Sequence, residues 1–253
     1  MFVDTHCHIF KSDYDNIDEV LNNASNNNVK YYINNGSDRE YNKEVLELVK
    51  QYDNMYGALG IHPETVDDYS LDDIEFIKNN LSNEKIVAIG EIGLDYHYTK
   101  ENKDEQIKLL EMQLSLAEEY NLPVIIHSRD ATEDTINTLK KFNCRGTIHS
   151  FSGSLETAKI YIKMGYLLGV NGVITFKNCN IKDVIKEVGL DNIVLETDSP
   201  YLTPVPYRGM QNNPSHILDI AKFVSELYNV SLEELSYRTN ENIKRMYERV
   251  KLD

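Results

Sequence analysis

Short apolar runs alternate with amphipathic stretches along the whole chain, and this alternation limits the folds that the chain can adopt. The runs are rich in Ile, Val and Tyr, which is typical of strands buried on both faces of a parallel sheet. They occur at residues 2–5, 31–34, 55–60, 86–90, 124–126, 146–148, 166–170 and 193–195. Helical patterns separate them, for example at residues 105–120 and 215–227. Eight strand–helix repeats predict an α/β fold and favour a closed (β/α)8 TIM barrel, with an open doubly wound sheet as the alternative.

The length of the chain agrees with one such barrel. A (β/α)8 barrel typically takes about 250 residues, and this chain has 253 with no linker between two halves, so we expect residues 1–253 to form a single domain. The net charge of −15 means that the overall field of the protein does not attract nucleic acid. A substrate that carries phosphate must therefore be held locally, by metal ions and a few Arg or Lys side chains.

The sequence shows no signal for export or for membrane insertion. The first residues lack the basic and apolar segments of a signal peptide, and no apolar run approaches the roughly 20 residues of a membrane span. The cysteines Cys7, Cys144 and Cys179 are odd in number and have no paired spacing, which argues against a disulfide framework. We expect a cytoplasmic protein without membrane contact, and we infer no obligate protein partner.

Histidines and carboxylates gather at the predicted carboxyl ends of the strands, where (β/α)8 enzymes carry their active sites. The group consists of His6, His8, His62, Glu91, His127, His149, Glu196 and Asp198. His6 and His8 lie on one face of their strand because side chains alternate with a period of two, which leaves Cys7 on the other face as a small buried residue. Buried carboxylates are costly unless a cation compensates them. The group therefore predicts a divalent metal site. His97 and His216 fit no site, and Asp95 has no assigned role.

Ordered motifs resemble the signature segments of the TatD DNase family, a branch of the amidohydrolase-like barrels. They are DTHCH at 4–8, GIHP at 60–63, GEIGLDY at 90–96, HSRDA at 127–131, HSFSG at 149–153, ETDSPYLTP at 196–204, and PYRG at 206–209 followed by Asn213-Pro214. Tyr207 stands where many relatives carry His. The resemblance implies two divalent metal ions per chain, with the metal identity open among Zn, Mn, Mg, Co and Ni. The implied ligands are, for the first metal, His6, His8 and Asp198; for the second, His127 and His149; and, as the bridge, Glu91.

The resemblance also implies a reaction, the hydrolysis of a phosphate ester by a metal-activated water. DNA is the expected substrate, with 3′–5′ exonuclease action. Asp198 is predicted to be the general base, beside Glu91. His62 would contact the phosphate or protonate the leaving group, or else it supports its Gly-Pro turn.

Four more residues are predicted to assist this reaction. Arg129 and Arg208 are expected to contact phosphate, because a guanidinium matches phosphate oxygens. Ser150 is expected to contact substrate, in a turn whose N–H groups would face an oxyanion. Glu196 would orient a histidine.

Other activities remain open for this site. One is the hydrolysis of a C–N or carboxylic ester bond, which includes the deacylation of aminoacyl-tRNA. Binuclear members of the wider class often bridge their metals with a carboxylated Lys on the fourth strand. Here Glu91 ends that strand and Lys85 lies at its start, which favours the phosphoesterase branch. The other is a metal-binding scaffold without catalysis, which would be expected to lose ligands, whereas this chain keeps all six.

Overall fold

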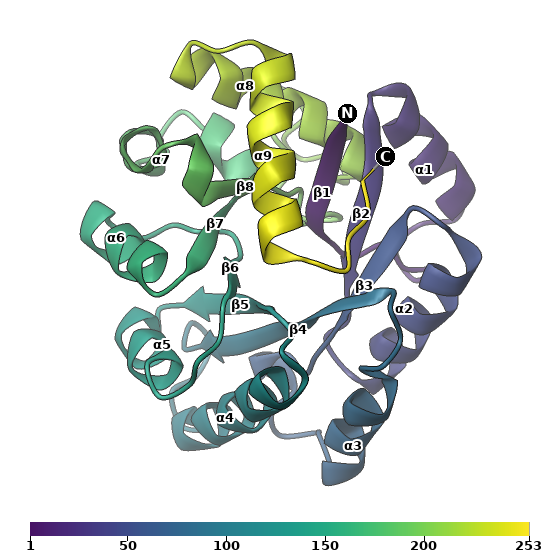
Figure 1. The fold of residues 1–253 in the computed structure, drawn as a ribbon, viewed down its shortest axis with the longest axis vertical. Helices are drawn as coiled ribbons and strands as arrows, with labels where there is room; N and C mark the ends of the chain where they lie inside the picture. The colour runs from purple at the N-terminus through teal and green to yellow at the C-terminus, as the bar shows by residue number, and fades with distance from the viewer. Residues whose placement is uncertain (253) are drawn as a thin grey trace.

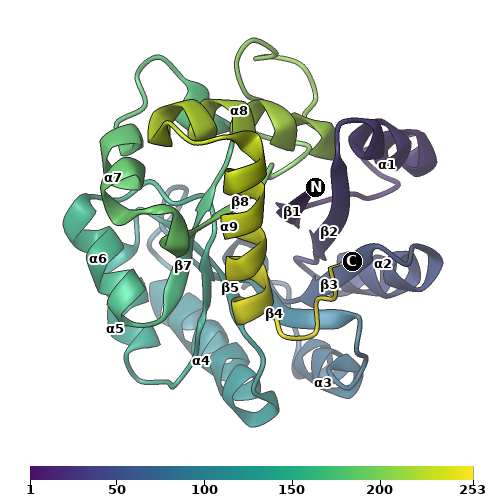
Figure 2. The same ribbon diagram turned by 45° about the horizontal axis from the view of Figure 1, so that its top comes forward.

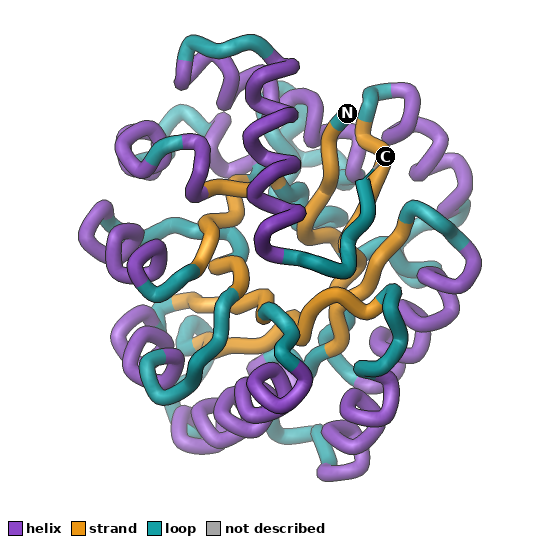
Figure 3. The backbone as a smooth tube through the Cα atoms, in the orientation of Figure 1, coloured by secondary structure: helices purple, strands orange, loops and turns teal. Residues whose placement is uncertain are grey.

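The computed structural model describes residues 1–252 and confirms the (β/α)8 barrel. The eight strands form one parallel sheet in the order of the sequence, from β1 to β8. A parallel bridge between Cys7 and Ser199 joins the two edges of this sheet, and β1 packs against β8. Helices surround the strands on the outside (Figures 1 and 3). The sequential strand order and the closing contact exclude the open doubly wound sheet.

All eight predicted runs are strands. Their bounds are β1 (Phe2–Cys7), β2 (Val29–Asn35), β3 (Met55–Leu59), β4 (Ile86–Asp95), β5 (Val124–Arg129), β6 (Gly146–Ile148), β7 (Tyr166–Val170) and β8 (Ile193–Leu195). The largest difference lies in β4, which continues beyond the apolar run to Asp95. Apolar content underestimates this strand because its last part carries residues of the site.

The outer layer consists of helices, most of which are amphipathic. They are α1 (Ile17–Asn26), α2 (Arg39–Gln51), α3 (Leu71–Asn80), α4 (Lys103–Tyr120), α5 (Thr132–Leu139), α6 (Leu155–Lys163), α7 (Ile181–Val188), α8 (Ile217–Tyr228) and α9 (Leu232–Met246). Polar side chains at Asn16, Asp38, Ser154 and Ser231 accept hydrogen bonds from the first turns of α1, α2, α6 and α9. None of the described helices is long and apolar enough to cross a lipid bilayer.

The interior of the barrel is apolar at one end and polar at the other. At the apolar end, strand residues such as Val3, Ile33 and Ile125 pack with Met246, the last residue of α9, and with Tyr247, which follows it. Figure 2 shows α9 lying across this end, with the N-terminus and the last described residues nearby. The guanidinium of Arg249 donates to the carbonyl oxygen of Ile86 at 2.7 Å and so ties the end of the chain to β4. The opposite, carboxyl end of the strands is left to polar side chains.

Candidate metal centre

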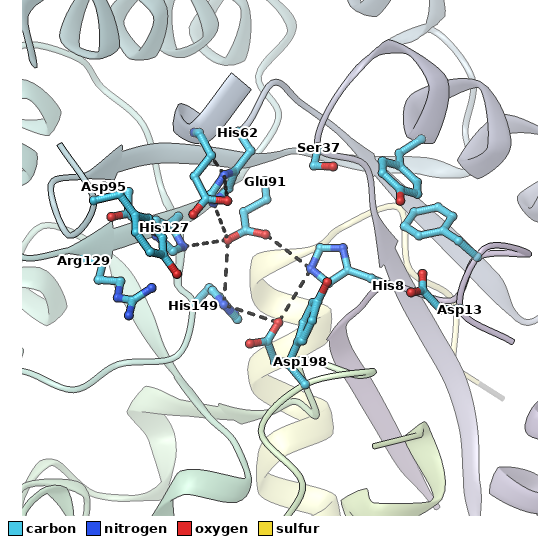
Figure 4. A pocket seen from close by; sticks show the side chains of 15 residues that line it. His8, Asp13, Ser37, His62, Glu91, Asp95, His127, Arg129, His149 and Asp198 are labelled. Atoms are coloured by element: carbon cyan, nitrogen blue, oxygen red, sulfur yellow. Dashed lines mark hydrogen bonds and ion pairs between the residues drawn. The ribbon is translucent and has the colours of Figure 1, made fainter. Parts of the chain in front are cut away.

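The carboxyl ends of β1, β4, β5, β6 and β8 bring six side chains together at the mouth of the barrel, and Figure 4 shows all of them except His6. They are the predicted ligands His6, His8, Glu91, His127, His149 and Asp198. All but His6, which is fully buried, line a cavity of about 440 Å³. Strand geometry explains the convergence, because parallel strands in a barrel end at the same rim.

Glu91 lies at the centre of this group and divides the imidazoles into two sets. Its Oε2 lies 3.3 Å from His6 Nε2 and 3.4 Å from His8 Nε2. Its Oε1 lies 2.9 Å from His127 Nδ1 and 3.8 Å from His149 Nε2. Each oxygen of one buried carboxylate therefore faces a different pair of imidazoles, which is the arrangement that a bridging ligand needs.

Asp198 closes the group from the side of β8. Its Oδ1 lies 3.6 Å from His8 Nε2 and 3.7 Å from both His6 Nε2 and His149 Nε2. The backbone of Asp198 has a φ of +57°, a left-handed conformation that is uncommon for a residue other than glycine. Its N–H donates to the carbonyl oxygen of His6 at 2.9 Å, so the loop after β8 is fixed to β1.

The histidines are anchored through the ring nitrogens that face away from the centre. His8 Nδ1 lies 2.9 Å from the carbonyl oxygen of Asn35, and His127 Nε2 lies 2.9 Å from Asp95 Oδ2. His149 Nδ1 lies 3.0 Å from Glu196 Oε1, an ion-pair contact whose geometry is not that of a hydrogen bond. An acceptor at one ring nitrogen keeps a proton there and leaves the lone pair on the other free to bind a cation. Asp95, for which the sequence indicated no role, thus holds His127.

The protonation of the group reflects its buried negative charge. Burial opposes the charged form of His127 and His149, but the surrounding carboxylates outweigh it and raise their pKa values to about 9 and about 10. Burial likewise favours a neutral Glu91, yet the imidazoles around it hold its pKa well below the usual range. Protons on these imidazoles therefore balance the negative charge of Glu91, as bound metal cations would.

The donor set fits divalent cations. Three groups of side chains, His6–His8–Asp198, His62–Glu91–His127 and His6–His149–Glu196, each bring one ligand atom per residue within 4.8 Å of the others. Imidazole nitrogens mixed with carboxylate oxygens suit zinc and several other first-row divalent ions. The group of His6, His8 and Asp198 is the one that the motifs imply for the first metal, whereas the group around Glu91 and His127 includes His62 in place of His149.

His62 lies on the edge of the group. Its Nε2 is 3.6 Å from Glu91 Oε1, and it lines the same cavity. Its Nδ1 accepts a hydrogen bond from the N–H of Glu64 at 3.3 Å, so it also caps the short turn that follows. Burial and the neighbouring imidazoles lower the pKa of His62 to about 3, although Glu91 acts in the opposite direction. His62 therefore supports the turn that follows it, and its side chain also lines the cavity.

The predicted substrate contacts differ in their positions. Arg129 lines the cavity, with its guanidinium 5.4 Å from the centre of the exposed Tyr98 ring. Arg208 lines neither this cavity nor the adjoining one, and its guanidinium stacks 3.8 Å above the ring of Phe176. Only Arg129 is therefore in reach of a bound phosphate in this conformation.

Ser150 lies in a second cavity of about 410 Å³, which shares His127, Arg129 and Asp198 with the first. The N–H of Ser150 donates to Glu196 Oε1 at 2.6 Å, and the N–H of Phe151 donates to the carbonyl oxygen of Gly169 at 3.1 Å. These two N–H groups are thus engaged within the protein, so an oxyanion contact from this turn would have to come from the N–H groups of Ser152 and Gly153. The Ser150 hydroxyl accepts from Asn171 and keeps its own proton available to the cavity.

Asp4, the first residue of the DTHCH motif, supports the site in a way that the sequence did not assign. Its side chain is fully buried, and its two oxygens accept hydrogen bonds from the N–H and the hydroxyl of Thr197. This contact holds the segment that carries Asp198 against β1. The available signal was a carboxylate in the middle of a strand that is buried along its whole length. His97 and His216 lie outside the site and pair with Asp130 and Asp219.

Comparisons with known proteins agree with the motifs. The family model described as TatD related DNase matches residues 3–248. A metal-dependent hydrolase of Bacillus subtilis, YabD, is 41% identical over 252 residues, which cover 98% of this chain and 99% of that protein. The Escherichia coli metal-dependent hydrolase YcfH is 35% identical, with coverages of 97% and 95%. The crystal structure of YjjV, a TatD homologue from E. coli, has a TM-score of 0.90 at 31% identity and covers 98% of both chains.

Proposed function

This chain belongs to the TatD family of metal-dependent hydrolases, and on that premise we propose that it hydrolyses phosphodiester bonds in DNA with the help of two divalent metal ions. The observation that carries the proposal is the position of Glu91. One buried carboxylate faces His6 and His8 with one oxygen and His127 and His149 with the other. Two cations bridged by one carboxylate are typical of enzymes that hydrolyse phosphate esters.

Six side chains would hold these cations. In this assignment His6, His8 and Asp198 would hold the first, His127 and His149 would hold the second, and Glu91 would be shared by both. The bound cations supply positive charge to the phosphate oxygens and lower the pKa of the attacking water. The chain itself supplies the anchors that aim each imidazole, because Asn35, Asp95 and Glu196 occupy the nitrogens on the far side.

The remaining steps belong to side chains of the cavity. Asp198 accepts a proton from the attacking water, since its carboxylate opens into the cavity between the two sets of imidazoles. His62 contacts the scissile phosphate at the edge of the group. Arg129 binds a non-bridging phosphate oxygen, and the Ser150 hydroxyl donates to the substrate from the second cavity.

The charge around the cavity favours a strand end over the middle of a long duplex. Among residues 1–252, Arg129 is the only Lys or Arg that lines the first cavity, whereas Asp13 and Glu64 lie on its wall. A continuous polyanion through this cavity would be repelled on the side of the two carboxylates. We therefore propose exonuclease action. Its 3′–5′ direction rests on the family resemblance.

The test is a cleavage assay on the purified protein with added Mn²⁺, Mg²⁺ or Zn²⁺. The substrates are single-stranded DNA, duplex DNA and RNA labelled at either end, a phosphomonoester and an aminoacyl ester. We expect metal-dependent loss of terminal nucleotides, abolished by EDTA and reduced in Glu91→Gln. Cleavage of the aminoacyl ester alone, at rates that depend on metal in the same way, would replace the phosphodiesterase assignment by the carboxylic ester alternative.

A further inference from the structure

Glu196 lies behind the predicted metal ligand His149. Its carboxylate could accept more hydrogen bonds than it receives from the described residues. It is fully buried just after β8. Its Oε1 accepts from the N–H of Ser150 at 2.6 Å and lies 3.0 Å from His149 Nδ1. Its Oε2 is equally buried and has no hydrogen-bond partner among residues 1–252. A buried carboxylate oxygen without a partner is costly, so a second function for Glu196 is expected.

His6 has the complementary need. Its Nε2 faces the centre, 3.3 Å from Glu91 Oε2, while its Nδ1 is buried and lacks a partner in the described part of the chain. The His6 ring stacks on that of His149 with centroids 3.6 Å apart and planes inclined by 19°. Both Nε2 atoms lie 3.7 Å from Asp198 Oδ1. The two rings therefore present their Nε2 atoms to the same Asp198 oxygen, and Glu196 lies on the far side of the His149 ring.

We propose that Glu196 positions a ligand of each metal at once: it holds His149 through Oε1 and His6 through Oε2, directly or through one water. One ligand-type atom from each of the three residues lies within 4.8 Å of the other two, a separation that one bridging water spans. The inference rests on the two-metal centre of the proposed function. It adds that the two metal sites share a single positioning residue on the side away from the substrate.

A glycine on the neighbouring strand makes room for this carboxylate. A Cβ atom on Gly169, the fourth of the five residues of β7, would come closest to Glu196 Oε2 and would lie 2.6 Å from the carboxyl carbon and 2.9 Å from Oε1. Atoms that are not bonded to each other do not approach a Cβ atom this closely, so the carboxylate would have to move. Gly169→Ala is therefore a way to displace Glu196 without changing a metal ligand.

Glu196→Gln separates the two functions of the carboxylate. A carboxylate offers two acceptor oxygens, whereas an amide offers one acceptor and one donor. The backbone N–H of Ser150 and the Nδ1–H of His149 both need an acceptor, so the amide oxygen takes the position of Oε1. The NH2 group then faces His6 Nδ1, which loses its acceptor and shifts its own proton toward Nε2, the nitrogen that binds the metal. The substitution therefore weakens the metal at His6 and largely spares the metal at His149.

The experiment is a calorimetric titration of the chelator-stripped protein with Zn²⁺. The wild type is expected to bind in two steps. Asp95→Asn is the matched control, because Asp95 contacts His127 and serves only the second metal. Loss of such an orienting partner typically weakens metal binding by roughly 10- to 100-fold. We expect Asp95→Asn and Glu196→Gln to weaken different steps by that factor, and Gly169→Ala to weaken both.

Two outcomes would overturn the inference. In the first, Glu196→Gln and Asp95→Asn weaken the same Zn²⁺ binding step and leave the other unchanged. Glu196 would then position His149 alone. A single Zn²⁺ step in the wild type would remove the coupling altogether. If Gly169→Ala does not fold by circular dichroism, Glu196→Gln decides the matter. Nitrogen-15 NMR of the imidazoles then shows whether the His6 proton has moved to Nε2. Neither measurement needs a substrate, so the result is independent of which bond the enzyme cleaves.

Discussion

Raising the pH should act in opposite directions on the metal-free and the metal-loaded protein. The pKa values of His127 and His149 are raised to about 9 and about 10 by the carboxylates around them. A histidine with a raised pKa stabilises the folded state fully below its unfolded pKa of about 6.5. That contribution is lost as the pH rises through 9 and 10. The metal-free protein should therefore lose stability between about pH 7 and pH 10.

The same protons compete with metal ions. A cation at the second site must displace the proton from His127 Nδ1 and from His149 Nε2, the atoms that face Glu91. Below pH 9 this release of two protons makes the logarithm of the association constant rise by about two per pH unit. Each proton corresponds to about 1.4 kcal/mol per pH unit. In the metal-free protein, the same two groups reduce the stability by about 3 kcal/mol per pH unit at most over this range.

Two measurements test this reasoning on one sample. Thermal melts of the metal-free and Zn²⁺-saturated protein at pH 7, 8 and 9 should diverge, with the metal-free Tm falling. Calorimetric titration at pH 7.5 in buffers of different ionisation enthalpy counts the protons released, and we expect close to two for the second metal. A count near zero, together with a metal-free Tm that does not depend on pH, would refute the protonated state that we assign to this histidine pair.

Three further predictions concern single side chains. Glu91→Gln should weaken both metals, measured as metal content after dialysis, and unchanged content with unchanged activity would exclude Glu91 as the bridge. Asp198→Asn should lower kcat by about 100-fold or more at saturating metal, at the scale of general base catalysis; a wild-type kcat would assign the base elsewhere. Arg129→Ala should mainly raise KM for an oligonucleotide and reduce the salt dependence of kcat/KM. Arg208→Ala is its matched control and should resemble wild type, because Arg208 packs on Phe176 and lines neither cavity. The reverse ranking of the two arginines in steady-state kinetics would show that the loop of Arg208 moves onto the substrate.

The sequence predicted the barrel well because its strands are buried on both faces, so continuous apolar runs mark them directly. It also predicted which side chains meet at the rim, since parallel strands end together and His6 and His8 share a face. It could not predict which nitrogen of each ring faces the centre. That choice depends on the Asn35 carbonyl oxygen and on Asp95, which approach from other strands.

Hydrogen bonds between distant segments account for the other differences. The turn after β6 looked open to a ligand, yet the N–H of Ser150 donates to Glu196, which follows β8. Arg208 looked like a phosphate contact in a rigid loop, yet the ring of Phe176 holds its guanidinium. A local pattern contains no information about partners that are tens of residues away, so these features required coordinates.

The closure of the barrel between β1 and β8 has a consequence for how the protein folds. Glu91, His127 and His149 come from three successive strands, so a chain that has folded only its middle part already contains the ligands of the second metal. His6 and Asp198 lie 192 positions apart in the numbering and meet only when the last pair of strands closes. Contacts between such distant segments form late, because bringing the two segments together costs chain entropy before the contact itself stabilises the fold. During refolding the second metal site should therefore be populated first, and uptake of the first metal would report the moment at which the ring of strands closes.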